Sequence, residues 1–132
     1  MKIEEKSCGC IIFDENKNVL LVKEDTGEWG FPKGHVEHDE SEEDTAKREV
    51  KEETNLDVEI DLNRRYTMYY TTDKGKYKEV VLFVAKKIGG NLKEQDGEIA
   101  EVRWVDMYDV TKILSYDSTK ELFNDVLSEN KL

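Results

Sequence analysis

The sequence predicts an α+β fold in which a mixed β-sheet is packed between helices, as an α/β/α sandwich. Short apolar runs at residues 8–13 and 80–85 have the length and composition of buried strands. Residues 42–54 and 119–128 instead carry apolar side chains at helical spacing. Short turn sequences separate several of the apolar runs, which favours hairpins, and the few helices must then cover the faces of the sheet.

The elements can be placed in order along the chain. Strands are expected at residues 8–13, 19–22, 56–60, 66–72, 77–86 and 102–105, and helices at 42–54, 107–114 and 119–128. Two stretches that contain several glycines, 25–39 and 88–97, are expected to be loops. Ser41 precedes the first long helix, with Asp44 three residues further on, and is a candidate helix cap. Ser118 is the corresponding candidate for the last helix.

The length and charge of the chain restrict its function. Its 132 residues suggest one domain over residues 1–132. The 31 acidic side chains outnumber the 20 basic ones, so the net charge is −11 at pH 7. A field of that sign repels nucleic-acid backbones and anionic membranes, so neither is expected as a partner. The apolar runs are too short to span a bilayer, and the first residues lack a secretory signal. We therefore expect a cytoplasmic protein, monomeric or homodimeric, that acts on a small molecule.

Cys8 and Cys10 are the two cysteines of the chain, and their spacing places both side chains on one face of a strand. A zinc site needs about four nitrogen or sulfur ligands, and no histidine or further cysteine lies nearby in the sequence. Buried thiols are therefore expected here, rather than a metal or redox site.

The helix expected at residues 42–54 carries an unusual arrangement of charge. Three glutamates lie beside its narrow apolar stripe on the helical wheel: Glu49, Glu52 and Glu53. Carboxylates so close together, and partly buried, repel each other unless cations are shared between them. Hard divalent ions such as Mg²⁺ or Mn²⁺ suit such a set of oxygen ligands. The alternative is a solvated acidic face, which is the common explanation of a charge run.

The stretch 34–56 resembles the Nudix box, whose pattern is G-x5-E-x7-R-E-U-x-E-E-x-G-U, with U an aliphatic residue. The matching positions are Gly34, Glu40, Arg48, Glu49, Val50, Glu52, Glu53 and Leu56. Asn55 departs from the pattern, because it stands where the box has its second glycine. Asparagine tolerates a positive φ well, so the helix is expected to end there in the same way. The order of strands and helices also resembles the Nudix fold.

The resemblance implies an enzyme that hydrolyses the pyrophosphate linkage of a nucleoside diphosphate joined to another group, with Mg²⁺ or Mn²⁺ as cofactor. By the same resemblance Glu49, Glu52 and Glu53 bind the metal, and Glu52 is a catalytic residue. Arg48 orients a glutamate, and Gly34 allows the preceding loop to close over the helix. Metals held there would neutralise phosphate oxygens and acidify a bound water for in-line attack on phosphorus.

The loop at residues 29–35 reads Trp-Gly-Phe-Pro-Lys-Gly-His and resembles that of the asymmetric diadenosine tetraphosphate hydrolases. This likeness implies a dinucleoside polyphosphate as substrate, with diadenosine tetraphosphate cut to ATP and AMP, and it makes Lys33 and His35 ligands of the polyphosphate. An exposed loop lysine and a hydrogen-bonded loop histidine are the plainer alternatives. Hydrolysis of nucleoside triphosphates or of RNA 5′ ends stays open as an alternative, as does a catalytically silent nucleotide-binding domain.

A further carboxylate is expected from outside the box. Members of the family often have one six residues before a tryptophan, and Glu98 stands six residues before Trp104. Glu98 is therefore the candidate for an extra metal ligand or the general base, and Glu101 is the second choice. A plain surface glutamate is the alternative for either.

The base-stacking residue is left open. Relatives of the animal type stack adenine on a tyrosine in the strand that matches residues 80–85, where this chain has no tyrosine. Tyr70 and Phe123 are therefore candidates for contact with a base, and Tyr69 and Tyr77 also qualify. All four rings are equally compatible with positions in the core.

Overall fold

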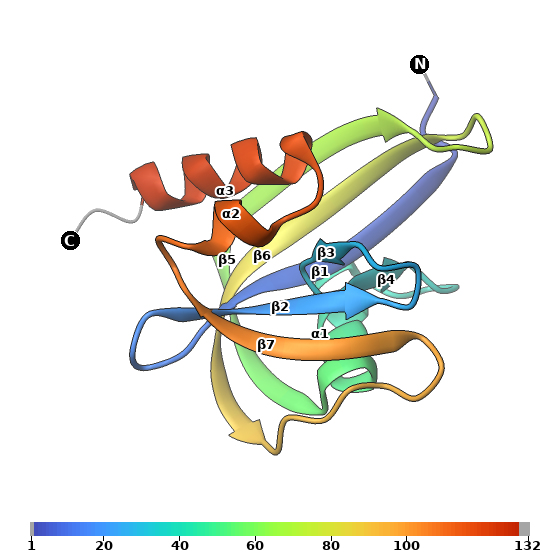
Figure 1. Cartoon of the computed structure of the whole chain (residues 1–132). Helices are drawn as coiled ribbons and strands as arrows, with labels where there is room; N and C mark the ends of the chain where they lie inside the picture. The colour runs from blue at the N-terminus through green and yellow to red at the C-terminus, as the bar shows by residue number, and fades with distance from the viewer. Residues whose placement is uncertain (1, 130–132) are drawn as a thin grey trace.

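The computed structural model describes residues 2–129 and shows a mixed sheet with helices on both faces (Figure 1). Met1 and residues 130–132, which belong to the expected domain, lie outside this range. Seven strands are seen in the described part: β1 (Glu5–Phe13), β2 (Asn18–Glu24), β3 (Trp29–Gly30), β4 (Lys33–His35), β5 (Leu56–Thr71), β6 (Tyr77–Gly90) and β7 (Ile99–Asp106). The helices there are α1 (Glu42–Thr54), α2 (Val110–Ile113) and α3 (Asp117–Glu129), none of which has the length and apolar composition of a membrane span.

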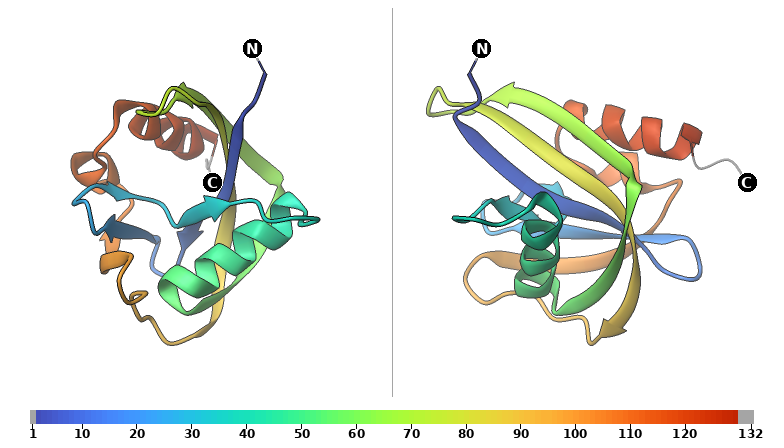
Figure 2. Two further views of the ribbon diagram at one scale, coloured as in Figure 1. Left: turned by 90° about the vertical axis from the view of Figure 1, so that its right-hand side faces the viewer. Right: turned by 180° about the vertical axis from the view of Figure 1, so that it is seen from behind.

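β1 lies at the centre of the sheet. It pairs in parallel with β6, from Glu5 opposite Lys78 to Phe13 opposite Lys86, and antiparallel with the short strand β4. β5 pairs antiparallel with β6, and β7 pairs antiparallel with β2. β1 and β2 pair at Phe13 and Val19, next to their hairpin, and beyond this point the sheet divides into two diverging wings (Figures 1 and 2). The sheet is therefore mixed, as the sequence predicts.

Both faces of the central strands are buried, because successive side chains alternate between two hydrophobic cores. On one face Ile11 and Leu82 pack with residues of α2 and α3, and on the other Phe83 packs with residues of α1. α1 and α3 accordingly lie on opposite sides of the sheet (Figure 2). Cys8 and Cys10 are buried free thiols in the core beneath α1, and burial raises the pKa of Cys8 to about 11 and that of Cys10 to about 12. The predicted α/β/α arrangement and buried thiols are confirmed.

α1 begins and ends at the residues that the sequence predicts. The side chain of Ser41 accepts a hydrogen bond from the backbone N–H of Asp44 (3.1 Å), and Asn55 ends the helix in the left-handed conformation with φ 63°. At the first turn, Glu42 accepts two hydrogen bonds from the guanidinium of Arg65 on β5 (2.8 and 2.9 Å). These contacts fix α1, and the acidic residues along it, against the sheet.

β5 differs from the prediction, because the strands expected at residues 56–60 and 66–72 form one long strand. Its register with β6 shifts between Ile60 and Arg65, and of the four residues between them only Leu62, which is exposed, is apolar. A shift of register interrupts the alternation of apolar and polar side chains. The sequence therefore predicts two separate strands where the structure has one continuous strand.

The other differences come from long-range pairing. The loop expected at 25–39 contains β3 and β4, which are too short to give a signal of their own. β6 continues to Gly90 because it is paired with β5, and the helix expected at 107–114 is limited to α2. Ser118 lies within α3, which begins at Asp117, so Ser118 is not the cap.

Candidate functional site

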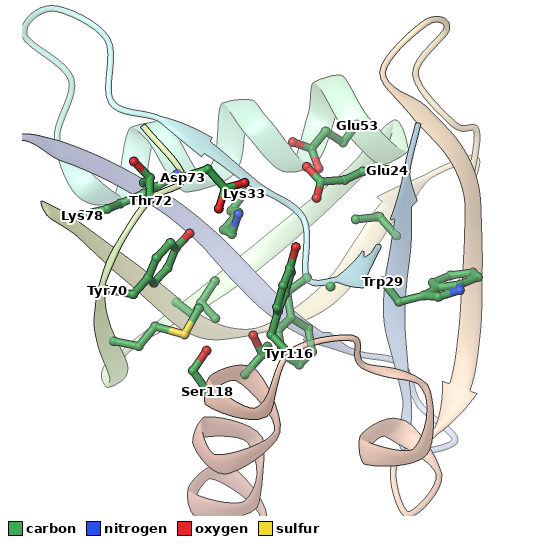
Figure 3. Close-up of a pocket in the computed structure, with 16 residues that line it drawn as sticks. Glu24, Trp29, Lys33, Glu53, Tyr70, Thr72, Asp73, Lys78, Tyr116 and Ser118 are labelled. Carbon is green, nitrogen blue, oxygen red and sulfur yellow. The ribbon is translucent and has the colours of Figure 1, made fainter. Parts of the chain in front are cut away.

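The loop between β3 and β4 lies across β1 and carries Lys33 to the site. Gly9 of β1 makes this approach possible, because a side chain there would collide with the carbonyl of Pro32 and with Lys33. The backbone N–H of Cys10 donates to the Pro32 carbonyl (3.1 Å), and Gly9 and Lys33 are paired in register. The side chain of Lys33 points into a pocket between the two wings of the sheet (Figure 3).

This pocket has a volume of about 430 Å³, which is within the range of small-molecule sites. Its charged side chains are Glu24, Lys33, Glu53, Asp73 and Lys78, and its larger apolar and aromatic ones include Phe31, Met68, Tyr70, Leu82 and Tyr116. In Figure 3, Glu24 and Glu53 lie together at one end, and the rings of Tyr70 and Tyr116 stand on either side of the space beneath them. One pocket therefore combines a charged end with an aromatic end.

Lys78 of β6 is a pocket residue that the sequence analysis missed. Its relative exposure is 8%, and within residues 2–129 its ammonium group makes no hydrogen bond or ion pair. Burial lowers the pKa of Lys78, and the neighbouring charge of Lys33 lowers it further. Two lysines in one pocket, one of them nearly buried and without a partner among the described residues, favour the binding of an anion. The sequence feature that could have identified Lys78 is its alternation with Val80 and Leu82, which places it on the inward face of the strand.

The glutamates of α1 differ in their surroundings. Glu53 has a relative exposure of 7%, and burial raises the pKa of its carboxyl group to about 8, with a further contribution from the charge of Glu49. Burial also raises the pKa of Glu49, and the charge of Glu52 adds to the effect. Ionising Glu49 and Glu53 together is therefore unfavourable unless a cation is shared between them.

The donor set suits a hard divalent cation, because it offers three carboxylates, one of them buried and repelled by a neighbour. In the described part of the chain, however, no three acidic, histidine or cysteine side chains converge as they do around a bound metal. Glu49 and Glu52 are instead hydrogen-bonded to Arg48. A metal ion bound by these glutamates would thus compete with the guanidinium of Arg48 for the carboxylate oxygens of Glu49 and Glu52.

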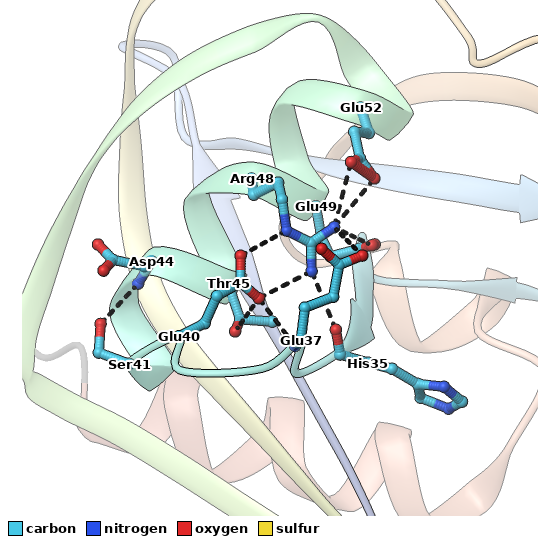
Figure 4. A network of polar contacts seen from close by, with 9 residues as sticks. All are labelled: His35, Glu37, Glu40, Ser41, Asp44, Thr45, Arg48, Glu49 and Glu52. Atoms are coloured by element: carbon cyan, nitrogen blue, oxygen red, sulfur yellow. Dashed lines mark hydrogen bonds and ion pairs between the residues drawn. The ribbon is translucent and has the colours of Figure 1, made fainter.

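Arg48 is the centre of a polar network that joins α1 to the loop before it (Figure 4). Its Nη1 lies 3.1 Å from Oε1 of Glu49 and 3.1 Å from both carboxylate oxygens of Glu52. Its Nη2 donates to the carbonyl of His35 (3.0 Å), and its Nε donates to Oε2 of Glu40 (2.6 Å). Arg48 thus holds two of the glutamates at a fixed place relative to the loop.

Glu40 holds Arg48 in turn. Its two oxygens accept from Nε and Nη2 of the guanidinium, in the bidentate geometry that gives strong, directional pairs. Oε1 also accepts from the hydroxyl of Thr45 (2.8 Å) and from the backbone N–H of Glu37 (2.9 Å). These hydrogen bonds lower the pKa of Glu40 to about 2, chiefly through Arg48. The first glutamate of the box is therefore an anchor for the arginine.

Gly34 lies directly over the carboxylate of Glu49. A Cβ atom at this position would overlap the Glu49 side chain, and Gly34 is paired with Cys8 of β1 on its other side. The loop, β1 and α1 therefore meet here without space for a side chain. Glycine at this position allows Glu49 to lie beneath the loop.

His35 does not reach the pocket. Its backbone carbonyl accepts from Arg48, whereas its imidazole points away from the network in Figure 4. The ring is 65% exposed, and its Nε2 lies 3.9 Å from a carboxylate oxygen of Glu5. In this conformation His35 contributes its backbone to the site, and its predicted contact with a polyphosphate stays a prediction.

The predicted contact between Phe123 and a substrate base is not supported by its position. Phe123 is fully buried, with ring centroids 6.5 Å from Phe13 and 5.7 Å from Phe31, so no face is free for a base. Its face of α3 is turned to the core because it carries the other apolar residues of the helix. Tyr69 and Tyr77 stack on each other, 6.1 Å apart, and do not line the pocket.

Glu98 lies outside the pocket. It is exposed in the loop before β7, and this loop is attached to the end of α1 because the backbone N–H of Gln95 donates to the carbonyl of Glu53 (3.2 Å). Glu98 is not among the residues that line the pocket. Its alternative, Glu101, is bound to Arg103 of the same strand (2.8 Å). Glu98 is therefore the freer carboxylate of the two.

Two further pocket residues were missed from sequence. Glu24, the last residue of β2, points toward Glu53 in Figure 3, and its charge contributes to the raised pKa of Glu53. Tyr116, between α2 and α3, is 56% exposed and stands across the pocket from Tyr70. Neither residue belongs to the box, so only the folded chain brings them to it.

Residues 4–125 match the family model described as NUDIX domain. The chain therefore belongs to the Nudix family, as the motif and the fold predict. The curated relatives include "Putative mutator protein MutT4" of Mycobacterium tuberculosis, 36% identical over 96 residues that make up 71% of this chain and 39% of that protein. Another is the asymmetrical bis(5′-nucleosyl)-tetraphosphatase of Caenorhabditis elegans, 35% identical over 91 residues, or 67% of this chain and 65% of that protein.

The chain is also similar in structure to an Ap4A hydrolase. A crystal structure of a C. elegans Ap4A hydrolase binary complex superimposes with a TM-score of 0.85 and 28% identity, over 95% of this chain and 96% of that one. Several curated relatives are much longer, however, and the chain spans 39%, 37% and 34% of the length of three of them. The comparisons therefore establish the Nudix family and its fold for this chain.

Proposed function

We propose that the protein is a metal-dependent pyrophosphohydrolase of dinucleoside polyphosphates, which cuts diadenosine tetraphosphate to ATP and AMP. The observation that carries this proposal is the pocket beside α1. It joins an aromatic end, a pair of lysines and the buried Glu53 in one continuous space. A nucleobase, a chain of phosphates and a metal-bound reaction centre need these three environments in that order.

The base is placed between Tyr70 and Tyr116. Stacking of a base on an aromatic ring contributes about 1–3 kcal/mol and works for any base, because each has a π-face. The volume of about 430 Å³ lies within the range of small-molecule sites, and we assign it to one nucleotide. We place the second nucleoside of the substrate outside the pocket.

The phosphates run from this base site past Lys78 and Lys33 to α1. The ammonium group of Lys78 makes no ion pair in the described residues, so it can pair with a phosphate without breaking an existing contact. Lys33 brings a second ammonium group close to Glu53, whose carboxyl group its charge already helps to ionise. His35 reaches the polyphosphate only if its imidazole turns toward the pocket.

The cofactor is Mg²⁺ or Mn²⁺, held by Glu49, Glu52 and Glu53. A divalent ion there would neutralise phosphate oxygens and lower the pKa of a water for in-line attack on phosphorus. Arg48 keeps Glu49 and Glu52 oriented while the site is empty of substrate, through the contacts to both carboxylates. Glu98, on the loop attached to the end of α1, is the candidate for a further ligand or the general base.

A nucleoside triphosphate pyrophosphohydrolase is the second candidate, because a site for one nucleotide accepts a triphosphate as well. RNA 5′ ends are less favoured, since the chain has a net charge of −11. We place the activity in the cytoplasm, on a small-molecule substrate, with the protein as a monomer or a homodimer.

Product analysis by chromatography tests these alternatives. The protein is incubated with Mg²⁺ and, separately, diadenosine tetraphosphate, the nucleoside triphosphates, ADP-ribose and 5′-triphosphate RNA. ATP and AMP from the first substrate, with much slower turnover of the others, is the expected result. Faster turnover of a triphosphate favours the second candidate. No turnover of any substrate by folded protein that binds Mg²⁺ refutes the proposed reaction and favours a silent nucleotide-binding domain.

A further inference from the structure

The linker between α2 and α3 is fastened to the edge strand β3 by a reciprocal pair of hydrogen bonds. The backbone N–H of Trp29 donates to Oγ of Ser115 (2.8 Å), and the backbone N–H of Ser115 donates to the carbonyl of Trp29 (3.2 Å). Ser115 is thus bound through both its side chain and its backbone to a residue far away in the sequence. We call this pair the Trp29–Ser115 clasp.

Both sides of the clasp rest on fixed parts of the fold. Trp29 is paired with Lys23 of β2, and its indole lies beneath the guanidinium of Arg103, 4.8 Å from the ring centroid. In Figure 3 this indole points away from Tyr116, so Trp29 serves the clasp with its backbone. On the other side, Leu114 is 2% exposed and anchors the linker in the core.

The clasp stands immediately before Tyr116, one of the two rings that flank the pocket. Tyr116 itself is 56% exposed, so its own packing does little to hold the ring in place. On the strand side, the chain continues from Trp29 through Pro32 to Lys33. The clasp therefore connects the aromatic wall of the pocket to the loop that carries a phosphate-binding lysine.

We infer that Ser115 is a positioning residue for the nucleobase, which acts by holding Tyr116 opposite Tyr70. This inference rests on the proposed function in one respect, that the pocket binds a nucleotide. The hydroxyl of Ser115 accepts the Trp29 N–H and so fixes the linker at the point where it turns into α3. Without this contact the ring of Tyr116 has more freedom, and part of the binding free energy is used to order it.

Ser115→Ala tests the inference. It removes the hydroxyl but keeps the backbone half of the clasp, and a single hydrogen bond contributes about 1 kcal/mol, which is roughly a five-fold change in an equilibrium constant. We expect KM for the dinucleotide and Kd for AMP, measured by calorimetry, to rise three- to ten-fold, while kcat stays within two-fold of wild type. Ser115→Thr keeps an acceptor oxygen and is expected to restore both constants.

Two comparisons separate positioning from general destabilisation. Ser128→Ala removes a hydroxyl that donates to the carbonyl of Asp125 on the same helix, and it should leave KM, Kd and the thermal midpoint unchanged. In a Tyr116→Ala background, Ser115→Ala should have no further effect on Kd, because the group that it positions is gone. Additive effects of the two substitutions would overturn the inference.

Failure of the inference and failure of the proposed function give different results. If the wild-type protein neither binds AMP nor turns over any nucleotide, the proposed function is wrong and Ser115 has no base to position. If the wild type binds AMP and Ser115→Ala has the same Kd, the inference alone is wrong. A fall in kcat with unchanged KM would likewise overturn it.

Discussion

Replacement of Glu53 by glutamine tests whether the glutamates of α1 are arranged for a cation. The pKa of Glu53 is about 8 in the folded chain, against 4.5 for an unperturbed glutamate. Between these values the folded state keeps a proton that the unfolded state has lost, so stability is present at low pH and falls as the pH rises. Each unit of pKa difference corresponds to about 1.4 kcal/mol. The difference between 4.5 and about 8 therefore lowers the free energy of unfolding by about 5 kcal/mol once the pH is above 8.

Glutamine has nearly the same shape and no charge, so Glu53→Gln removes this dependence. Without divalent metal, the variant is expected to be about 3–5 kcal/mol more stable than wild type at pH 8.5, and about equal to it near pH 4.5. The assay is equilibrium urea unfolding at both pH values in EDTA, repeated with Mg²⁺. Mg²⁺ should stabilise the wild type at pH 8.5 and have a much smaller effect on the variant.

The matched control is Glu43→Gln on the same helix. Glu43 is partly exposed and forms an ion pair with Lys47 (3.0 Å), so its replacement changes the net charge equally and touches no buried group. Its effect on stability should stay within about 0.5 kcal/mol at both pH values. Parallel pH profiles for wild type and Glu53→Gln would refute the argument, because they would show that Glu53 ionises in the folded chain as freely as in the unfolded one.

Three other substitutions test the site by activity. Glu52→Gln should lower kcat by at least a hundred-fold in a protein that unfolds normally, and activity within a few-fold of wild type would contradict the metal assignment. Gly34→Ala places a methyl group against the carboxylate of Glu49, so kcat should fall at least ten-fold in steady-state assays; an unchanged kcat would show that Glu49 need not lie there. Lys78→Met should raise KM for the dinucleotide at least ten-fold with little change in kcat, whereas the exposed turn residue Lys74 gives the matched control, Lys74→Met, with unchanged KM.

The acidic half of the site could be predicted from sequence because it is local. Ser41 caps the beginning of α1 and Asn55 caps its end, both through contacts with the helix itself. The three glutamates lie along that one helix. Their relative placement depends on helical geometry alone. Arg48 is one turn from Glu52 and meets it at 3.1 Å, as that spacing implies. No information about the rest of the fold was needed.

The substrate half could not be predicted in the same way, because its residues come from separate elements. Glu24, Lys78 and Tyr116 belong to β2, β6 and the linker before α3, and long-range pairing alone brings them together. Tyr116 and Phe123 are only seven residues apart, yet one faces the pocket and the other the core. The apolar face of α3 identifies Phe123 as a core residue, whereas the position of Tyr116 depends on where the linker is attached.

The charges of the pocket link the metal to the substrate. Lys33 and Lys78 are balanced by Glu24 and Asp73, and Glu53 adds a further negative charge when it ionises, so the pocket has no net positive charge on its own. A polyphosphate adds several negative charges to this site, in a chain whose net charge is already −11. A divalent cation beside Glu53 removes both difficulties, because it neutralises the carboxylates and attracts the phosphates. Metal and nucleotide should therefore raise each other's affinity by the same factor, as linkage requires.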